Sequence, residues 1–283
     1  MTARILDCTQ AEYFADPCHV PSLNQSIART LVMKSPAHAW TEHPRFGGRR
    51  RDPTEQMTNG SLIHEVLLQG SENLVLVAAD DWRTKDARAQ RDEAIVAGKT
   101  PILERKFAEV SRAAEEIKLA LAGFGVGFVG RSEVPIEWHE TDSGTGAPVV
   151  CRGMLDHFEM GAIATVYDLK TTESASPSSC ERSAYNFGYD IQAAAYTSAV
   201  EKLHPEMAGL VEFVFLFAET TPPYAVYPCR PDGTLRELGE RRWQRAVDLW
   251  AMCLASNVWP GYADKVGVLS APTWALSQEE GLL

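Results

Sequence analysis

The feature that most constrains the fold is a pair of adjacent apolar segments with the character of β-strands. They are VVCRGMLDHFEM (149–160) and IATVYDLKTT (163–172), and only Gly161 and Ala162 separate them. Two strands joined by so short a connection form an antiparallel hairpin. We therefore expect a hairpin here, and the remainder of the chain must fold around it.

The register of this hairpin would bring two carboxylates together. Alternate residues of a strand share a face, so Asp168 and Lys170 point to the same side. If the turn covers residues 161–163, position 156 pairs with position 168, and the Cβ atoms of Asp156 and Asp168 lie roughly 5 Å apart. Facing carboxylates repel each other unless a cation lies between them, and Mg²⁺ prefers oxygen ligands of this kind. This predicts a site for Mg²⁺, or alternatively Mn²⁺, with the Lys170 ammonium beside it.

A divalent ion next to a lysine is the arrangement that phosphodiester hydrolysis requires. The ion lowers the pKa of water and neutralises developing charge, and the ammonium adds further stabilisation. The alternative is an ordinary charged strand edge, because Asp-x-Lys is a common pattern on exposed strands.

The other patterns predict an α/β protein with a central mixed sheet flanked by helices. Helical patterns occupy residues 23–34 (with Ser22 as N-cap), 60–68, 103–121, 189–203 and 235–256, and strand patterns occupy residues 74–78, 133–139, 209–218 and 222–228. We expect loops at 43–56 and at the Ser-rich 173–187, and a solvated helix or loop at 82–100. We expect a single domain over residues 1–283, with an N-terminal helical portion at about 20–125 and the catalytic sheet core at about 130–260.

Composition limits the classes of protein. The net charge of −11 argues against a protein that coats nucleic acid, but it leaves room for an enzyme with a local basic track. The six cysteines contain no CxxC pair, which argues against a zinc ribbon or an iron–sulfur cluster. No run of about 18 apolar residues and no signal peptide are present, which predicts no membrane association and a cytoplasmic location.

Four short motifs follow one another along the chain: GSLIH (60–64), GMLD (153–156), DLKTT (168–172) and QAAAY (192–196). In this order they resemble the G-x-x-x-H, G-x-x-D, D-x-K-T and Q-x-x-x-Y motifs of the RecB-like branch of the PD-(D/E)xK nuclease superfamily. Two further stretches, SLNQSIARTLVMKSPAHAW and DWRTKDARAQRDEAIVAGKTPI, are similar to exonuclease VIII (RecE-type) proteins of phages and prophages. The resemblance covers residues 20–260 and implies a restriction-endonuclease-like core.

The resemblance implies roles for the acidic and basic motif residues. Asp156 and Asp168 would be metal ligands, the backbone carbonyl of Leu169 would face the same ion, and Lys170 would orient or activate water. His64 would be a further ligand or would stabilise the site. The second acid is Asp rather than Glu, which shortens its reach toward the metal.

Three further sets of residues are expected near the substrate. Glu133, which precedes the hairpin, would be an additional acidic ligand. Gln192 and Tyr196 are one helical turn apart and would lie beside the active site, contacting DNA or bracing the lysine. The densest basic run is Arg45, Arg49, Arg50 and Arg51. These arginines are either a solvated loop or contacts to the phosphate backbone.

The resemblance further implies an exonuclease that resects linear double-stranded DNA in phage-type recombination. Such enzymes tend to form ring-shaped homo-oligomers and to act with a single-strand annealing protein. Two alternatives stay open at this point: a DNA endonuclease of the same superfamily, and a non-catalytic DNA-binding recombination scaffold.

Overall fold

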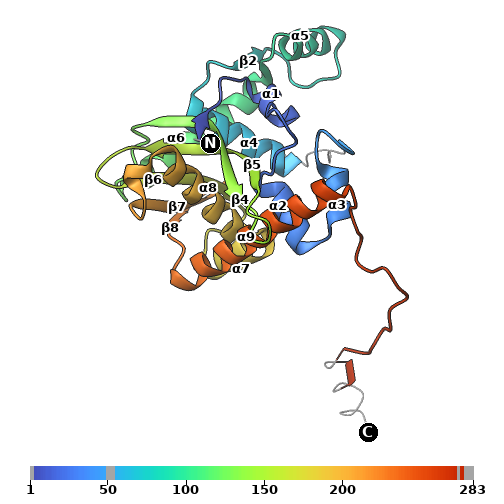
Figure 1. The fold of residues 1–283 in the computed structure, drawn as a ribbon. Coiled ribbons are helices and arrows are strands. Elements are labelled where there is room, and N and C mark those ends of the chain that lie inside the picture. Colours follow the sequence, from blue (N-terminus) through green and yellow to red (C-terminus); the bar gives the residue numbers. More distant parts are fainter. Residues whose placement is uncertain (1–2, 49–54, 273–274, 277–283) are drawn as a thin grey trace.

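A six-stranded mixed sheet forms the centre of the protein (Figure 1). The computed structural model describes residues 3–48, 55–272 and 275–276. The strands lie in the order β1 (Arg4–Ile5), β4 (Arg131–Thr141), β5 (Pro148–Glu159), β6 (Ala164–Thr172), β7 (Val211–Glu219) and β8 (Val226–Cys229). Neighbours are antiparallel except for β6 and β7, which are parallel. The α/β fold with a mixed central sheet is therefore confirmed.

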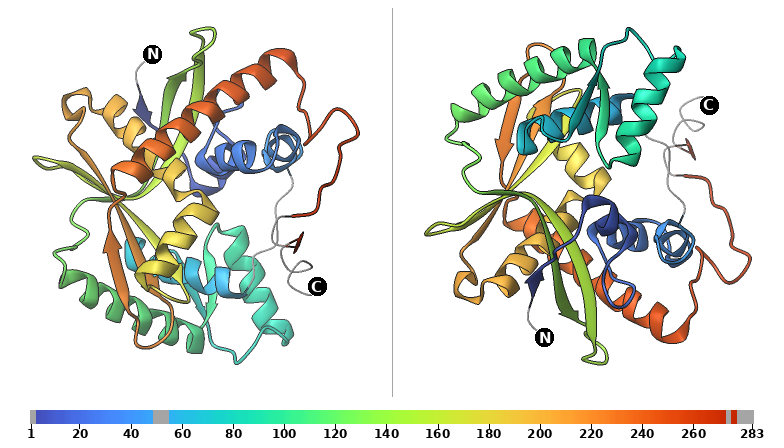
Figure 2. Two further views of the ribbon diagram at one scale, coloured as in Figure 1. Left: turned by 90° about the horizontal axis from the view of Figure 1, so that it is seen from below. Right: turned by 90° about the horizontal axis from the view of Figure 1, so that it is seen from above.

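Helices cover both faces of this sheet (Figure 2). One face carries α2 (Gln25–Met33), α8 (Tyr189–Leu203) and α9 (Gly233–Ser256), and the other carries α4 (Glu55–Gln69) and α6 (Glu104–Ala122). β7 shows why the sheet is buried on both sides, since its side chains alternate between the two apolar clusters. Phe213, Phe215 and Phe217 belong to the first cluster, and Val214, Leu216 and Ala218 belong to the second. A continuous apolar run is the pattern expected of such a strand.

The remaining elements lie around this core. They are α1 (Gln10–Ala15), α3 (Pro36–Glu42), α5 (Lys85–Val96), α7 (Pro177–Phe187), the 3-10 helix η1 (Pro205–Met207), and a separate two-stranded parallel sheet of β2 (Leu74–Val77) and β3 (Thr100–Leu103). No helix in the described ranges has both the length and the apolar character needed to cross a membrane. After Pro260, whose carbonyl accepts a hydrogen bond from the Ala37 amide at 3.0 Å, residues 261–272 lead away from the sheet (Figure 1).

Two local predictions were wrong. The cap of α2 is Asn24, whose side chain accepts a hydrogen bond from the Ile27 amide at 2.9 Å, while Ser22 is buried and donates to Asp16. The Ser-rich segment predicted as a loop contains α7, because Pro177 occupies the first helical turn and the left-handed Gly188 (φ 64°) ends the helix.

β5 and β6 pair over only three positions before they diverge. The pairs are His157–Tyr167, Phe158–Val166 and Glu159–Thr165, which is the predicted register, around a turn at residues 160–163. Farther along, the free edge of β5 pairs with Leu23 instead, whose amide donates to the Val150 carbonyl at 2.9 Å. β6 continues beside β7 through Thr172. A gap in backbone pairing therefore opens between residues 153–156 of β5 and residues 168–170 of β6.

α8 packs closely on the face of β5 beside this gap, because Gly153 has no side chain. A Cβ atom on Gly153 would lie 2.7 Å from Cε1 of Tyr196 and 3.3 Å from Cζ3 of Trp138. Gly60 plays a similar part between α4 and β6, where a Cβ atom would collide with Oγ1 of Thr171. The two motif glycines thus allow the helices to approach the strands closely.

We expect Gly153→Ala to lower the free energy of unfolding by about 1–3 kcal/mol, because the added methyl group must displace a buried ring. Urea denaturation measures this effect. Gly233→Ala is the matched control, since Gly233 has open space around its Cβ position and begins α9. Equal stability of the two variants would contradict the close packing of α8 on β5.

Candidate metal centre and active site

Three side chains from three elements converge beside the gap. His64 comes from α4, Glu133 from β4 and Asp156 from β5. His64 Nε2 lies 3.0 Å from Asp156 Oδ2, and His64 Nδ1 lies 3.4 Å from Glu133 Oε1. One donor atom from each residue lies within 4.8 Å of the other two, which makes this trio a candidate metal centre.

Glu133 reaches this position through an irregularity in the β4–β5 ladder. Its φ is 50°, a left-handed conformation that costs a non-glycine residue on the order of 1–3 kcal/mol. The backbone pairs on either side are intact: Ser132–His157 and Val134–Leu155. Glu133 and Asp156 face each other between these pairs without being paired themselves. Such an outlier, next to three convergent donors, points to a functional constraint.

A second group of side chains lies on β6 and α8. Gln192 Nε2 donates to Asp168 Oδ1 at 2.5 Å, and Lys170 Nζ donates to Gln192 Oε1 at 2.9 Å. Lys170 Nζ also lies 2.5 Å from Asp168 Oδ2. Because its side-chain amide donates to Asp168 and accepts from Lys170, Gln192 fixes the carboxylate of Asp168 and the ammonium of Lys170 relative to each other.

Asp156 connects the two groups. Its Oδ2 accepts a hydrogen bond from the Leu169 amide at 2.9 Å, in addition to its contact with His64. Asp168 is not a member of the trio with His64 and Glu133, and it is fully buried beside Gln192. The structure therefore brings together six of the predicted residues, His64, Glu133, Asp156, Asp168, Lys170 and Gln192, as two linked groups. Their roles stay predictions.

The site contains more carboxylates than basic groups, and this shifts the pKa values of its residues. Burial lowers the pKa of His64, but the Asp156 and Glu133 carboxylates outweigh this effect and raise it to about 9. Burial raises the pKa of Glu133 to about 7 and that of Asp168 to about 6. Burial also lowers the pKa of Lys170, but the carboxylates of Asp168 and Asp156 outweigh it and raise the pKa, so this side chain stays charged.

This donor set fits a divalent cation. Glu133 Oε1 is buried and has no hydrogen-bond partner among the described residues, although His64 is near. An unsatisfied buried carboxylate oxygen costs free energy unless a cation or donor meets it. Two carboxylates and one imidazole are ligands that Mg²⁺ or Mn²⁺ can use.

The two tyrosines of α8 differ in their surroundings. Tyr196 is only 4% exposed and packs against Gly153 and the ring of Phe213, which is the environment of a core residue. Its predicted role at the substrate stays a prediction. Sequence analysis missed Tyr189, whose ring centroid lies 4.6 Å from Lys170 Nζ. The i,i+3 spacing of Tyr189 and Gln192 was the signal that could have identified it.

The predicted basic run lies only partly within the described structure. Arg45 Nη1 donates to the Cys18 carbonyl at 2.8 Å, and so braces the N-terminal segment. Arg49, Arg50 and Arg51 lie outside the described residues. The proposal that these arginines contact phosphates therefore stays a prediction.

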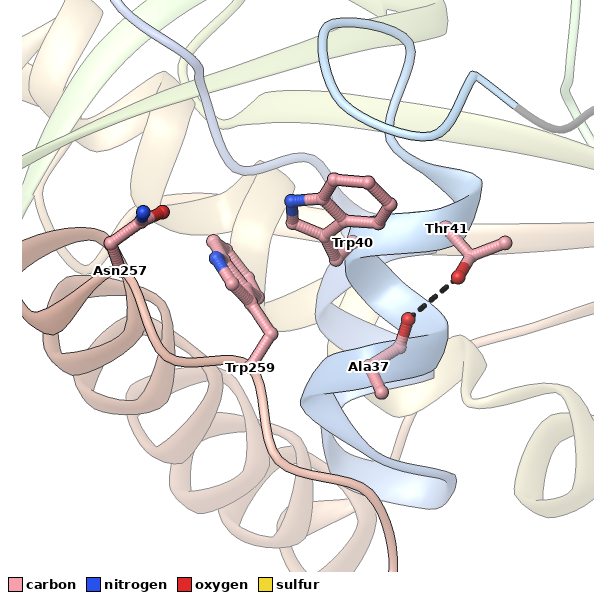
Figure 3. A pocket seen from close by; sticks show the side chains of 5 residues that line it. All are labelled: Ala37, Trp40, Thr41, Asn257 and Trp259. Carbon is pink, nitrogen blue, oxygen red and sulfur yellow. Dashed lines mark hydrogen bonds between the residues drawn. The ribbon is translucent and has the colours of Figure 1, made fainter.

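A shallow pocket of about 390 Å³ lies elsewhere, between α3 and the segment after α9 (Figure 3). Its lining residues are Ala37, Trp40, Thr41, Asn257 and Trp259. Thr41 Oγ1 donates to the Ala37 carbonyl at 2.8 Å, and the two indole rings border the opening (Figure 3). None of the predicted site residues lines this pocket.

The family described as "PDDEXK-like domain of unknown function (DUF3799)" matches residues 29–272. The chain belongs to this family.

Comparison with solved structures supports the same fold. A crystal structure from Eubacterium rectale, described as a proposed exonuclease, shares 11% identity with this chain at a TM-score of 0.63. The comparison covers 98% of this chain and 99% of that one. The structure of SSO0001 shares 16% identity over 66% of this chain and 85% of that one, but its TM-score of 0.26 is too low to indicate a shared fold. No curated protein matches the chain.

We expect the affinity for Mn²⁺ to rise between pH 7 and pH 9. His64 must lose its proton to become a ligand, and its pKa without metal is raised to about 9, so protons compete with the ion throughout this range. Isothermal titration calorimetry at several pH values measures the effect. His64→Gln should bind Mn²⁺ more weakly at pH 9 and with a flatter pH dependence. An affinity of the wild type that does not change from pH 7 to pH 9 would exclude His64 as a ligand.

Proposed function

We propose that this protein is a divalent-metal-dependent nuclease that hydrolyses phosphodiester bonds in DNA. The observation that carries the proposal is the junction at Asp156. There a trio of candidate metal ligands meets a lysine whose position is fixed by Gln192 and Asp168. Membership of the PDDEXK-like family supports the same proposal.

The ligands proposed for Mg²⁺ or Mn²⁺ are His64, Glu133, Asp156 and Asp168, with the Leu169 carbonyl as a further oxygen. When bound, the ion would lower the pKa of the attacking water and neutralise charge on the phosphate. The carboxylates repel one another unless a cation lies among them, so they would hold the ion beside Lys170.

Lys170 acts as a fixed positive charge in this proposal. Its raised pKa keeps the ammonium protonated at neutral pH, so it donates hydrogen bonds to a phosphate oxygen or to the attacking water. Gln192 holds Nζ in place before the substrate arrives, which avoids reorganisation during the reaction.

We further propose that the substrate is linear double-stranded DNA, resected from its ends for phage-type recombination. The motif resemblance supports this, and the description of the Eubacterium rectale protein as an exonuclease supports digestion from an end. The proposed partner protein is a single-strand annealing protein, and the proposed oligomer is a ring of identical subunits. A non-catalytic scaffold is less favoured, because it would have no use for the strained Glu133 beside a second carboxylate. An endonuclease of the same superfamily stays the alternative.

Lys170→Ala should reduce the rate of DNA hydrolysis at least about 100-fold, because a preorganised charge at the reacting phosphate is removed. The assay follows the release of nucleotides from linear duplex DNA with Mg²⁺ and, in parallel, the integrity of covalently closed circles. Loss of linear DNA alone supports an exonuclease, whereas cutting of closed circles shows an endonuclease.

The matched control is Lys118→Ala, which removes an exposed lysine of α6. It should keep the wild-type rate, and circular dichroism should show both variants folded. Full activity of a folded Lys170→Ala variant would refute the proposed site.

A further inference from the structure

Contacts of Phe187 with Tyr189 and of Tyr189 with Lys170 lead from the protein surface to the candidate lysine, and Tyr185 is a second exposed ring on the last turn of α7. Tyr185 and Phe187, at the C-terminal end of α7, are 55% and 50% exposed. The Phe187 and Tyr189 ring centroids lie 5.8 Å apart, and the Tyr189 ring lies 4.6 Å from Lys170 Nζ. We call Tyr185, Phe187 and Tyr189 the α7 aromatic patch. Large exposed rings cost free energy in water, and their position next to the site points to a binding surface.

Arginines surround this patch, although the chain as a whole carries a net charge of −11. Arg29 Nη1 donates to the Phe187 carbonyl at 3.4 Å, and the Arg242 guanidinium lies 4.9 Å from the centre of the Tyr185 ring. Arg182 lies one turn before Tyr185 on the same helix. Arg242 also pairs with the buried Asp190 at 3.0 Å, which holds its guanidinium in place. Asp190 offsets the charge of Arg242, and Glu181 stands beside Arg182, so Arg29 is the cation nearest to Phe187 that could meet a phosphate.

The junction between α7 and α8 holds the patch in a fixed position relative to Lys170. Gly188 adopts φ 64° there, and its Cβ position would be 2.9 Å from Cγ of Arg29. Arg29 on α2 thus packs directly against the junction. The two exposed rings are carried by the end of α7 and the half-buried Tyr189 by the start of α8, rather than by a free loop, so they can act as a preformed surface.

We propose that the α7 aromatic patch binds unpaired bases of single-stranded DNA, with Phe187 as the principal stacking side chain. Flat rings flanked by cations match bases and phosphates, and stacking requires bases that are free of a duplex. The strand would then run from the patch past Tyr189 to Lys170. The proposal rests on the proposed function and deepens it, because it gives the site a strand that is unpaired before it is cut.

The test uses single-stranded oligonucleotides that carry 2-aminopurine near one end, with EDTA present so that no hydrolysis occurs. Stacking on a protein ring quenches this base. Phe187→Ala should weaken binding at least about 5-fold and remove the quenching. Phe187→Tyr should keep both, and Phe187→Leu should not. The matched control is Phe124→Ala, which removes a 64% exposed ring after α6 and should change neither quantity.

The outcomes separate this inference from the proposed function. If the wild type degrades DNA but Phe187→Ala binds and quenches the oligonucleotide like the wild type, the stacking proposal is wrong and the nuclease proposal stands. If the wild type binds single strands through Phe187 but no divalent ion gives hydrolysis, the stacking surface stands and the nuclease proposal fails. A patch that contacts another protein instead would leave oligonucleotide binding unchanged in all Phe187 variants, which also overturns the stacking proposal.

Discussion

The hydrogen bond from the Leu169 amide to the Asp156 carboxylate is the interaction on which the site depends. It bridges β5 and β6 one step past the last backbone pair, where the two strands diverge. Beyond that pair, the hydrogen bond links Asp156 directly to the strand that carries Lys170. Gln192 of α8 contacts Asp168 and Lys170 on the same strand. The glycine at position 153 allows α8 to pack closely against β5 beside the site.

The same geometry brings three carboxylates close together in a largely buried place. Glu133, Asp156 and Asp168 share a small, largely buried space with two basic groups, and burial raises the pKa of Glu133 and Asp168. Without a metal ion, the positive charge beside Asp156 comes from a protonated His64, and the positive charge beside Asp168 comes from Lys170. A divalent ion at this place would offset the repulsion and burial of the carboxylates. The strained backbone of Glu133 holds one of these carboxylates in position for it.

The parts of the structure that could be predicted from the sequence were those set by the spacing of residues within one segment. Helix 189–203 and the hairpin register follow from spacing alone, and both agree with the structure. The positive φ of Glu133 depends on how β4 meets distant segments, so no local pattern reveals it. The contact of Tyr189 with Lys170 had one local signal, the one-turn spacing of Tyr189 and Gln192. α7 was missed because its many serines suggested a loop, although Pro177 and Gly188 mark a helix start and end. The predicted pairing of Asp156 with Asp168 was replaced by two linked groups, because the strands separate there.

Anomalous diffraction from crystals grown with Mn²⁺ tests the central claim most directly. We predict a manganese peak at the Asp156 carboxylate, within ligand distance of at least two of His64, Glu133 and Asp168. The same peak should vanish in Asp156→Asn. A fully occupied manganese site elsewhere on the protein, with none at Asp156, would contradict the account.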